Sequence, residues 1–293
     1  EPVGEDQSTV NTVELGGINI HEGGMLILCN WMADELYRND YLISEGKTLT
    51  LNRNARLECQ RWGSNTLTIN GEVKAVNTGL YSDAGISRFT GTGTLWVDNL
   101  QVRNPNQGGV NSSSAGQISF TNLRLNLQGS GGTIVGRQWG NLTFDNMTVG
   151  FWGRNTQWNR GPEGTANTVF YNTVTFDTLD AQDGTTPRTF TYTAQSRQPT
   201  GSGRVRKINP GSAIFEFSPG WTGGTFVEGG TVGFSTSNVT LSGPVLVTGE
   251  GSSLEFPSAT SVTFSGAFSM TNGTVALARA ETARFSGATS VSK

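Results

Sequence analysis

The sequence predicts an all-β protein and, within that class, a right-handed parallel β-helix, also called a β-solenoid. Glycine accounts for 40 of the 293 residues, and charged residues make up only 15%, against about 25% in an average globular protein. Thr, Asn and Ser are abundant as well, a bias that favours turns and β-branched strand positions over helix interiors. In addition, a short strand signature returns along the chain at the spacing expected for whole solenoid turns.

In this signature an apolar or aromatic residue precedes Asn, and further apolar residues follow. Four clear copies occupy residues 96–102, 120–125, 144–149 and 170–174. Their asparagines are 23, 24 and 26 residues apart, at Asn99, Asn122, Asn146 and Asn172. Shorter copies precede them at 49–52 and 67–70, and a second set with Ser-Gly in place of Asn follows at 239–243, 262–266 and 283–287.

Each copy alternates apolar and polar residues but is too short to hide its apolar face alone, so successive copies must stack. The spacings predict irregular turns of roughly 18 to 29 residues, which stack at about 4.8 Å into an elongated rod. An antiparallel sandwich or barrel also has short strands and regular turns, but recurrence at whole-turn spacing favours the solenoid. An Asn at equivalent places tolerates a left-handed backbone and can bond the copy above it.

Composition divides the chain into four segments. Residues 1–44 are expected to form an N-terminal arm and a capping helix, since residues 24–39 combine helix formers with apolar residues at helical spacing. Residues 45–178 hold the first set of turns. Residues 213–293 hold the second set, which either continues or is capped by other chains. Between them, residues 179–212 are rich in Gly, Pro and basic residues, which predicts a loop or segment break.

Charge and motif content argue against several functions. The net charge of −3, with no long run of one sign, offers no footprint for nucleic acid. The chain contains no run of about 18 apolar residues, so the sequence does not predict insertion into a membrane. The chain lacks C-x-x-C, a His pair and an acidic calcium loop, so neither a metal nor a cofactor is predicted. His21 is the only histidine, a poor basis for a Ser-His-Asp triad. Cys29 and Cys59 could pair or remain free thiols.

The best candidates for catalysis are three carboxylates that follow an apolar strand and enter the predicted loop: Asp177, Asp180 and Asp183. Glycosidic cleavage needs only two suitably spaced carboxyl groups, so this cluster could serve a polysaccharide-degrading enzyme. Asp beside Gly more often builds a turn, and this second interpretation is favoured. The sequence therefore leans against an enzyme.

A second candidate site combines aromatic and basic side chains in the predicted inter-turn segment 150–163. Exposed rings beside Arg suit the apolar faces and hydroxyl edges of sugars, and they suit a subunit interface equally well. An interface or a packed loop is favoured over glycan contact. The residues concerned are Trp139, Trp152, Arg154, Trp158 and Arg160.

Turns that read Phe-Thr-Asn-Leu-Arg-Leu at 120–125 and Phe-Asp-Asn-Met-Thr-Val at 144–149 resemble the pectate-lyase-like β-helix of bacteriophage tailspikes and tail fibres. The resemblance covers roughly residues 45 to 290, and it carries no catalytic residue across. It implies a homotrimer whose N-terminal region attaches to other virion tail proteins. It also implies a shaft that recognises or degrades bacterial surface polysaccharide.

The expected function is that of a structural or receptor-binding virion component in a phage tail. The same architecture occurs in adhesins of the bacterial surface and in secreted polysaccharide lyases, and fold alone does not decide between them. An extracellular or cell-surface adhesin is therefore the second interpretation. A polysaccharide-degrading lyase or hydrolase is the third, because the chain departs from such enzymes in lacking a clear acid pair.

Overall fold

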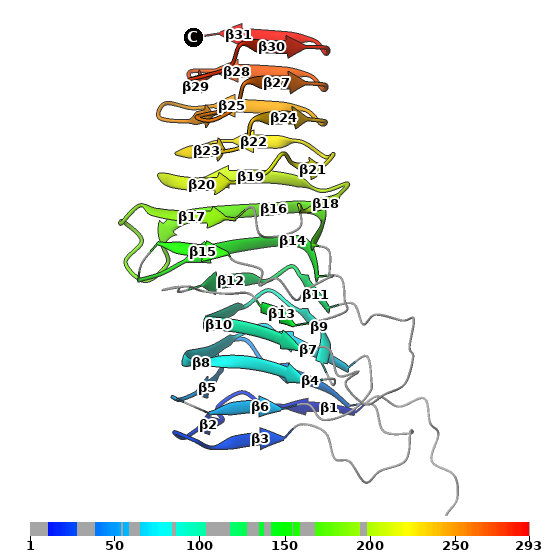
Figure 1. Cartoon of the computed structure of the whole chain (residues 1–293). Coiled ribbons are helices and arrows are strands. Elements are labelled where there is room, and N and C mark those ends of the chain that lie inside the picture. The colour runs from blue at the N-terminus through cyan, green and yellow to red at the C-terminus, as the bar shows by residue number, and fades with distance from the viewer. Residues whose placement is uncertain are drawn as a thin grey trace, which may run out of the picture.

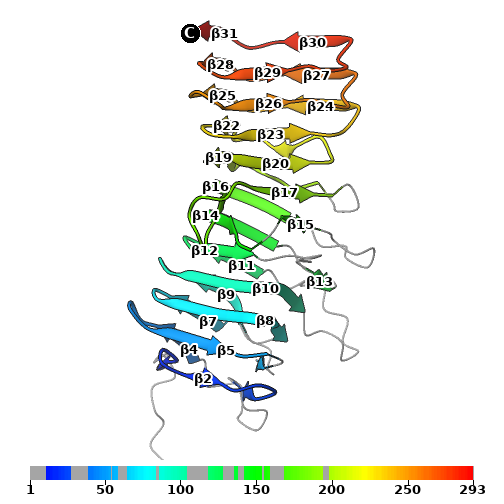
Figure 2. The same cartoon turned by 90° about the vertical axis from the view of Figure 1, so that its left-hand side faces the viewer.

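A computed structural model describes residues 11–27, 39–53, 55–58, 65–83, 86–103, 118–127, 135–137, 142–153, 155–158, 168–193 and 198–292. These residues form an elongated parallel β-solenoid, with the earliest turns at one end and the last turns at the other (Figures 1 and 2). The predicted all-β solenoid is confirmed. The described residues contain no helix, and so none long and apolar enough to cross a membrane.

Each complete turn contributes strand segments to three stacks, and the pairings between turns are parallel throughout the described residues. The first stack contains β1 (Asn11–Glu14), β4 (Asn39–Ile43), β7 (Asn65–Ile69), β9 (Ile86–Thr90), β11 (Ile118–Thr121), the first part of β14 (Leu142–Phe151), the first part of β16 (Thr168–Asp180), β18 (Thr200–Gly201) and β21 (Gly220–Trp221). In later turns β24 (Asn238–Leu241), β27 (Ser261–Phe264) and β30 (Thr282–Phe285) pair with one another.

The second stack runs through the whole described length of the rod without a break. It contains β2 (Asn19–Ile20), β5 (Thr48–Leu51), the first parts of β8 (Glu72–Asp83) and β10 (Thr94–Arg103), β12 (Arg124–Leu127), the later parts of β14 and β16, β19 (Arg204–Ile208), β22 (Thr225–Val227), β25 (Val245–Thr248), β28 (Phe268–Thr271) and β31 (Thr289–Ser292).

The third stack completes each turn and consists of three series. β3 (Met25–Ile27) pairs with β6 (Arg56–Glu58), and the later parts of β8 and β10 pair with each other and with β13 (Val135–Arg137). The longest series contains β15 (Thr156–Trp158), β17 (Arg188–Tyr192), β20 (Gly211–Phe215), β23 (Thr231–Phe234), β26 (Ser253–Glu255) and β29 (Thr274–Ala276).

Alternation along each strand sends every second side chain into the solenoid, where equivalent positions form columns. Phe89, Phe120, Phe144 and Phe170 form one such column in the first stack. Successive ring centroids lie 4.8, 5.7 and 6.0 Å apart, and each side chain is at most 1% exposed. Full burial of a Phe side chain contributes about 1.5–3 kcal/mol, so these columns supply much of the stability.

The predicted role of the recurring asparagines is confirmed for three of them at the corner between the first and second stacks, whereas Asn99 lies farther along its turn, in the later part of β10. Asn122, Asn146 and Asn172 have φ angles of 62°, 48° and 49°, a left-handed conformation that Asn adopts more readily than most residues. The Asn146 amide donates to Oδ1 of Asn122 at 2.9 Å, and the Asn172 amide donates to Oδ1 of Asp145 at 2.6 Å. These bonds connect successive turns outside the core.

The expected capping helix is wrong where the structure describes it. Residues 25–27 are strand β3, which pairs with β6, and Asn39 begins strand β4; residues 28–38 lie outside the described residues. The expected arm is also too long, because β1 and β2 already belong to the stacks. The hydrophobic pattern is ambiguous here, because a run of three apolar residues is compatible with a short strand as well as with one turn of a helix. Cys29 and Cys59 lie outside the described residues.

The expected loop or segment break at 179–212 is instead part of the solenoid. After a turn at residues 181–187, the stretch contains β17, β18, β19 and the start of β20. β17 pairs with β15 and β20, and β19 pairs with β16 and β22. The Gly and Pro residues mark the corners of these turns rather than an interruption between two bodies.

The turns are less regular, and differently arranged, than the signature implies. Partner positions Phe176, Lys207 and Val227 in the second stack are 31 and then 20 residues apart. The copies at 49–52 and 67–70 belong to different stacks, in β5 and β7. Their spacing of 18 residues is therefore shorter than one turn. The two strands alternate apolar and polar residues in the same way, so the sequence alone makes them look like equivalent strands of successive turns.

Replacement of Gly266 by Ala tests how tightly the corners stack. A Cβ at this position would overlap the main chain of Gly243 in the preceding turn and lie 2.8 Å from the nitrogen of Pro244. Since overpacking typically costs 1–3 kcal/mol, we expect Gly266→Ala to lower the free energy of unfolding by about 2 kcal/mol in denaturant titrations. The neighbouring, exposed Ser265→Ala should change it by less than about 0.5 kcal/mol; equal effects would contradict this packing.

Candidate functional site

The predicted acidic site lies at the corner where the second stack ends, and Asp177 is its first residue. Asp177 occupies an outward position of β16, beside Gly150 of the preceding turn, and is only 7% exposed. Its Oδ2 accepts a hydrogen bond at 2.9 Å from Nη2 of Arg124, which lies two turns away in β12. The Arg124 side chain can cross the intervening turn because Gly150 has no side chain: a Cβ there would lie 2.8 Å from Nη2.

Two asparagines extend this ion pair along the rod. Nε of Arg124 donates to Oδ1 of Asn126 at 2.9 Å, which orients the guanidinium. On the other side, the amide of Asn209 donates to Oδ1 of Asp177, also at 2.9 Å. Since Asn209 follows β19, the network joins turns that contain β12, β16 and β19. Both carboxylate oxygens of Asp177 therefore bind groups that hold turns together.

Asp180, at the end of β16, is the most deeply buried of the candidate acids, with 2% of its surface exposed. Its Oδ2 accepts hydrogen bonds from Nε and Nη2 of Arg188 and, at 2.8 Å, from the main-chain nitrogen of Gly153. Its Oδ1 accepts from the nitrogen of Gln182 at 2.8 Å. Burial alone would raise the pKa of Asp180, but these hydrogen bonds and the Arg188 charge outweigh it and hold the pKa below its usual range.

Asp183 belongs to an exposed turn rather than to a shared site. Its carboxylate accepts hydrogen bonds from the main-chain nitrogens of Thr185 and Thr186, both at 2.8 Å, and from the Thr186 hydroxyl at 2.6 Å. The Thr186 contacts are the main reason that the pKa of Asp183 lies well below its usual range. This is the side-chain-to-backbone pattern by which Asp builds a turn.

The structure thus gives the three acids separate sets of structural partners. Asp177 and Asp180 accept hydrogen bonds from different arginines, and Asp183 closes the 181–187 turn. No two of them have a hydrogen-bonding group in common among the described residues. Their arrangement is that of residues that hold strands and turns together.

The aromatic candidates are only partly described. Trp152 follows β14 and is buried, with 7% of its surface exposed, so it is not an open platform for a sugar. Its ring makes an edge-on contact with Trp96, with centroids 5.9 Å apart and planes inclined at 77°. The indole nitrogens of Trp96 and Trp152 are both buried, and neither has a hydrogen-bond partner among the described residues. Trp158 ends β15, but its side-chain surroundings are not among the described features.

The remaining members of the predicted Trp and Arg site lie outside the described residues. They are Trp139, Arg154 and Arg160.

Sequence reasoning missed Lys207, which occupies an inward position of β19. Its neighbours in the same column are Phe176 and Val227, and all three side chains are 0% exposed. The ammonium reaches the corner of the turn, where Nζ donates to the main-chain oxygens of Ile208 at 2.8 Å, Asn209 at 2.5 Å and Gly229 at 2.9 Å. Desolvation lowers the pKa of Lys207 to about 7, although the nearby Asp177 charge favours the charged form.

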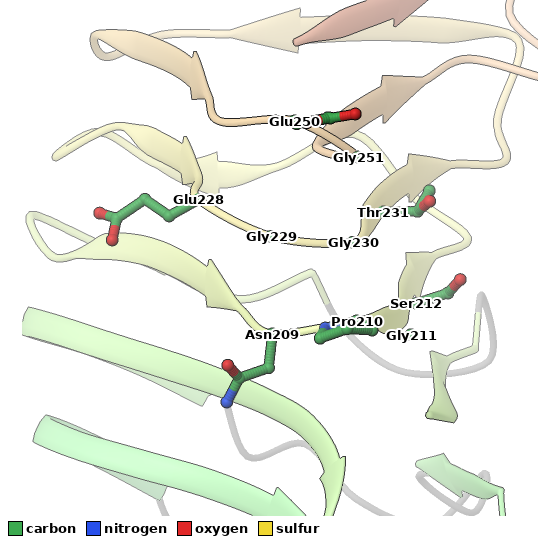
Figure 3. Close-up of a pocket in the computed structure, with 10 residues that line it drawn as sticks. All are labelled: Asn209, Pro210, Gly211, Ser212, Glu228, Gly229, Gly230, Thr231, Glu250 and Gly251. Atoms are coloured by element: carbon green, nitrogen blue, oxygen red, sulfur yellow. The ribbon is translucent and has the colours of Figure 1, made fainter. Parts of the chain in front are cut away.

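A groove with a volume of about 510 Å³ lies beside this buried ammonium. It is formed by successive corners, one above another, and its walls are mainly main chain and glycine (Figure 3). The side chains of Glu228 and Glu250 point to opposite sides of it (Figure 3). Its lining residues are Asn209, Pro210, Gly211, Ser212, Glu228, Gly229, Gly230, Thr231, Glu250 and Gly251.

A local signal could have revealed Lys207. In the run Arg204-Val205-Arg206-Lys207-Ile208, strand alternation places Lys207 on the same face as the core residue Val205. A lysine on an apolar face requires partners for its charge. Arg124 carries no such signal, because its role depends on which turn lies two places farther along.

Comparisons of this chain with models of protein families, with curated proteins and with solved structures gave no match. The assignment of a function therefore rests on the geometry of the site.

Asp180→Asn tests whether the buried carboxylate stabilises the fold through its hydrogen bonds and its ion pair. The amide group cannot accept every hydrogen bond that Asp180 receives, and it leaves the Arg188 guanidinium without a charged partner. Because breaking a buried ion pair typically costs 3–5 kcal/mol, we expect the free energy of unfolding to fall by about 3 kcal/mol. Asp183→Asn is the matched control: Asn also builds such turns, so its effect on stability should be much smaller than that of Asp180→Asn. A reversed order would contradict these assignments.

Lys207 makes the stability depend on pH in the alkaline range. Its pKa is about 7 when folded and 10.5 in the unfolded reference, so between these values the unfolded chain binds more protons. Stability should therefore rise from pH 7 to pH 10, by at most about 1.4 kcal/mol per pH unit. Denaturant titrations across this range check it. In Lys207→Met the contribution should vanish; the same slope in both proteins would contradict the shifted pKa.

Proposed function

We propose that this chain is a structural and receptor-binding shaft, in a phage tail fibre or tailspike, that recognises bacterial surface polysaccharide without cleaving it. The proposal depends on the observation that the three candidate acids make structural hydrogen bonds. Asp177 and Asp180 join separate turns, and Asp183 closes its own turn. Acids that hold the turns together leave the rod with an extended surface for contact rather than a reaction centre. The resemblance of its turns to those of tailspikes supports the same role.

The electrostatics of these acids argue against cleavage of glycosidic bonds. A glycosidase needs one carboxylic acid that remains protonated near neutral pH, which requires a raised pKa. The pKa values of Asp180 and Asp183 are shifted in the opposite direction. Asp177 is engaged by Arg124 and Asn209. None of the three suits the role of a general acid.

The groove supports binding of a hydroxyl-rich ligand. Ser212 and Thr231 offer hydroxyl groups, and Glu250 offers acceptors at its side. Sugars are bound by such polar groups, and a shallow site of this kind binds each unit weakly. If three shafts assemble, as the resemblance implies, several weak contacts act on one surface and the combined binding becomes strong.

An adhesin of the bacterial surface is the alternative location for the same shaft. The groove and the fastened corners would serve an adhesin equally well, since fold does not specify the organism that uses it. Oligomeric state separates the two proposals: the phage component is expected to be a trimer, whereas an adhesin shaft can act as a monomer.

Particle mass and polysaccharide length, measured together, test the proposed function. We would determine the mass by analytical ultracentrifugation with light scattering, before and after incubation with bacterial surface polysaccharide. The expected result is a trimer that binds the polysaccharide and leaves its chain length unchanged. Shortened polysaccharide would replace the proposal with an enzyme, and a monomer that neither binds nor cleaves would refute the virion shaft.

A matched pair of variants locates the binding. Thr231→Trp places a large ring in the groove, whereas Thr274→Trp places it two turns farther along the same outward column, away from the groove. We expect only Thr231→Trp to weaken polysaccharide binding, by at least tenfold. Equal binding by both variants would show that the groove is not the contact site.

A further inference from the structure

Lys207 stands in a column that is otherwise built for apolar side chains. Leu125, Val149, Phe176 and Val227 are its fellow members in neighbouring turns, and all are 0% exposed. A charged group in such a place is unfavourable unless the protein supplies partners. The column accepts the lysine because its apolar stem follows the core and its head reaches the corner.

The partners at that corner form a cage of main-chain oxygens. The ammonium has three N–H donors, and they bind the carbonyl oxygens of Ile208, Asn209 and Gly229 at 2.8, 2.5 and 2.9 Å. These oxygens come from two successive turns. Convergent main-chain carbonyls are the groups with which proteins replace the water around a small cation.

The cage lies directly behind the wall of the groove. Asn209 and Gly229 contribute oxygens to the cage and also line the groove. A Cβ on Gly230 would lie 2.9 Å from Nζ of Lys207 and 2.7 Å from the Asn209 oxygen, so only glycine fits between them. Without the head group of Lys207, the cage oxygens would face one another with no donor, a costly arrangement for buried groups.

The nearby charge of Asp177 favours the ammonium form of Lys207 and offsets part of the cost of its burial. Asp177 attracts the ammonium and is fixed in place by Arg124 and Asn209. Glu228 follows β22 near the cage and is bound by Arg206 through both carboxylate oxygens, at 3.0, 3.0 and 2.6 Å. Arg206 and Glu228 therefore form an ion pair with each other.

We propose that the Ile208, Asn209 and Gly229 carbonyls form a binding site for a monovalent ammonium-type cation, and that Lys207 supplies this cation from within the chain. The tethered cation joins two turns at their corners and fixes the wall of the groove. This inference does not depend on the proposed function.

Chemical rescue tests the cage. Lys207→Ala keeps the Cβ, so n-propylammonium supplies the atoms that are lost, and 1-propanol supplies the same chain with a hydroxyl in place of the charge. Hydrogen exchange of residues 208–212 and 228–231 would be measured at pH 6 in each solution, at constant ionic strength. Val227→Ala is the matched control, because it creates a cavity in the same column without touching the cage.

We expect n-propylammonium to increase the protection of both segments in Lys207→Ala, by about tenfold at ten times its dissociation constant. Propanol should give a smaller increase, and Val227→Ala should not distinguish the two compounds. Equal effects of propanol and n-propylammonium in Lys207→Ala would overturn the proposal, because only a cation site discriminates by charge.

The wild-type protein gives a second test if Lys207→Ala does not fold. An ammonium whose three protons all bind carbonyl oxygens exchanges them slowly with water, so a lysine side-chain ¹H–¹⁵N signal should persist at pH 6. Lys207→Met would assign this signal by its loss. A wild-type spectrum without any protected ammonium signal would overturn the cage.

Discussion

In-register stacking of parallel turns is the constraint on which every other feature of this molecule depends. Each inward side chain meets the equivalent residues of the turns before and after it, about 4.8 Å away along the rod. Flat rings suit this repeat, as in the column from Phe89 to Phe170. The same spacing brings Arg124 within reach of Asp177 across Gly150. The core and the corner network are therefore products of one register.

The parts of the fold that could be predicted from sequence are those determined by neighbouring residues. Asn122, Asn146 and Asn172 were interpretable because a left-handed residue between two short strands is a local requirement. Which corner each asparagine occupies is not local, and for this reason the copies at 49–52 and 67–70 were assigned to one series. The turn at 181–187 concealed the continuation of the stacks through 179–212, because its Gly and Pro resemble those of a linker.

The candidate site shows the same division. The turn-forming role of Asp183 follows from its immediate neighbours, whereas the side-chain partners of Asp177 lie 53 and 32 residues away and become adjacent only through the register. Alternation could have indicated Lys207, since Val205 fixes which side of β19 faces inward. The carbonyl cage itself could not be anticipated, because every residue supplies the same main-chain oxygen and only the path of the chain makes three of them converge.

Turns of unequal length can share these columns because the additional residues leave the rod at a corner and return to the same position. The antiparallel bridge between Leu179 and Pro187 closes one such excursion at its base. The exposed residues 182–185 of this excursion can therefore change in number without altering the strands, whereas Asp180 at its base holds neighbouring turns together. The rod is in this sense a scaffold with exchangeable surface segments, so foreign peptides inserted within residues 182–185 would be displayed at a fixed height along it.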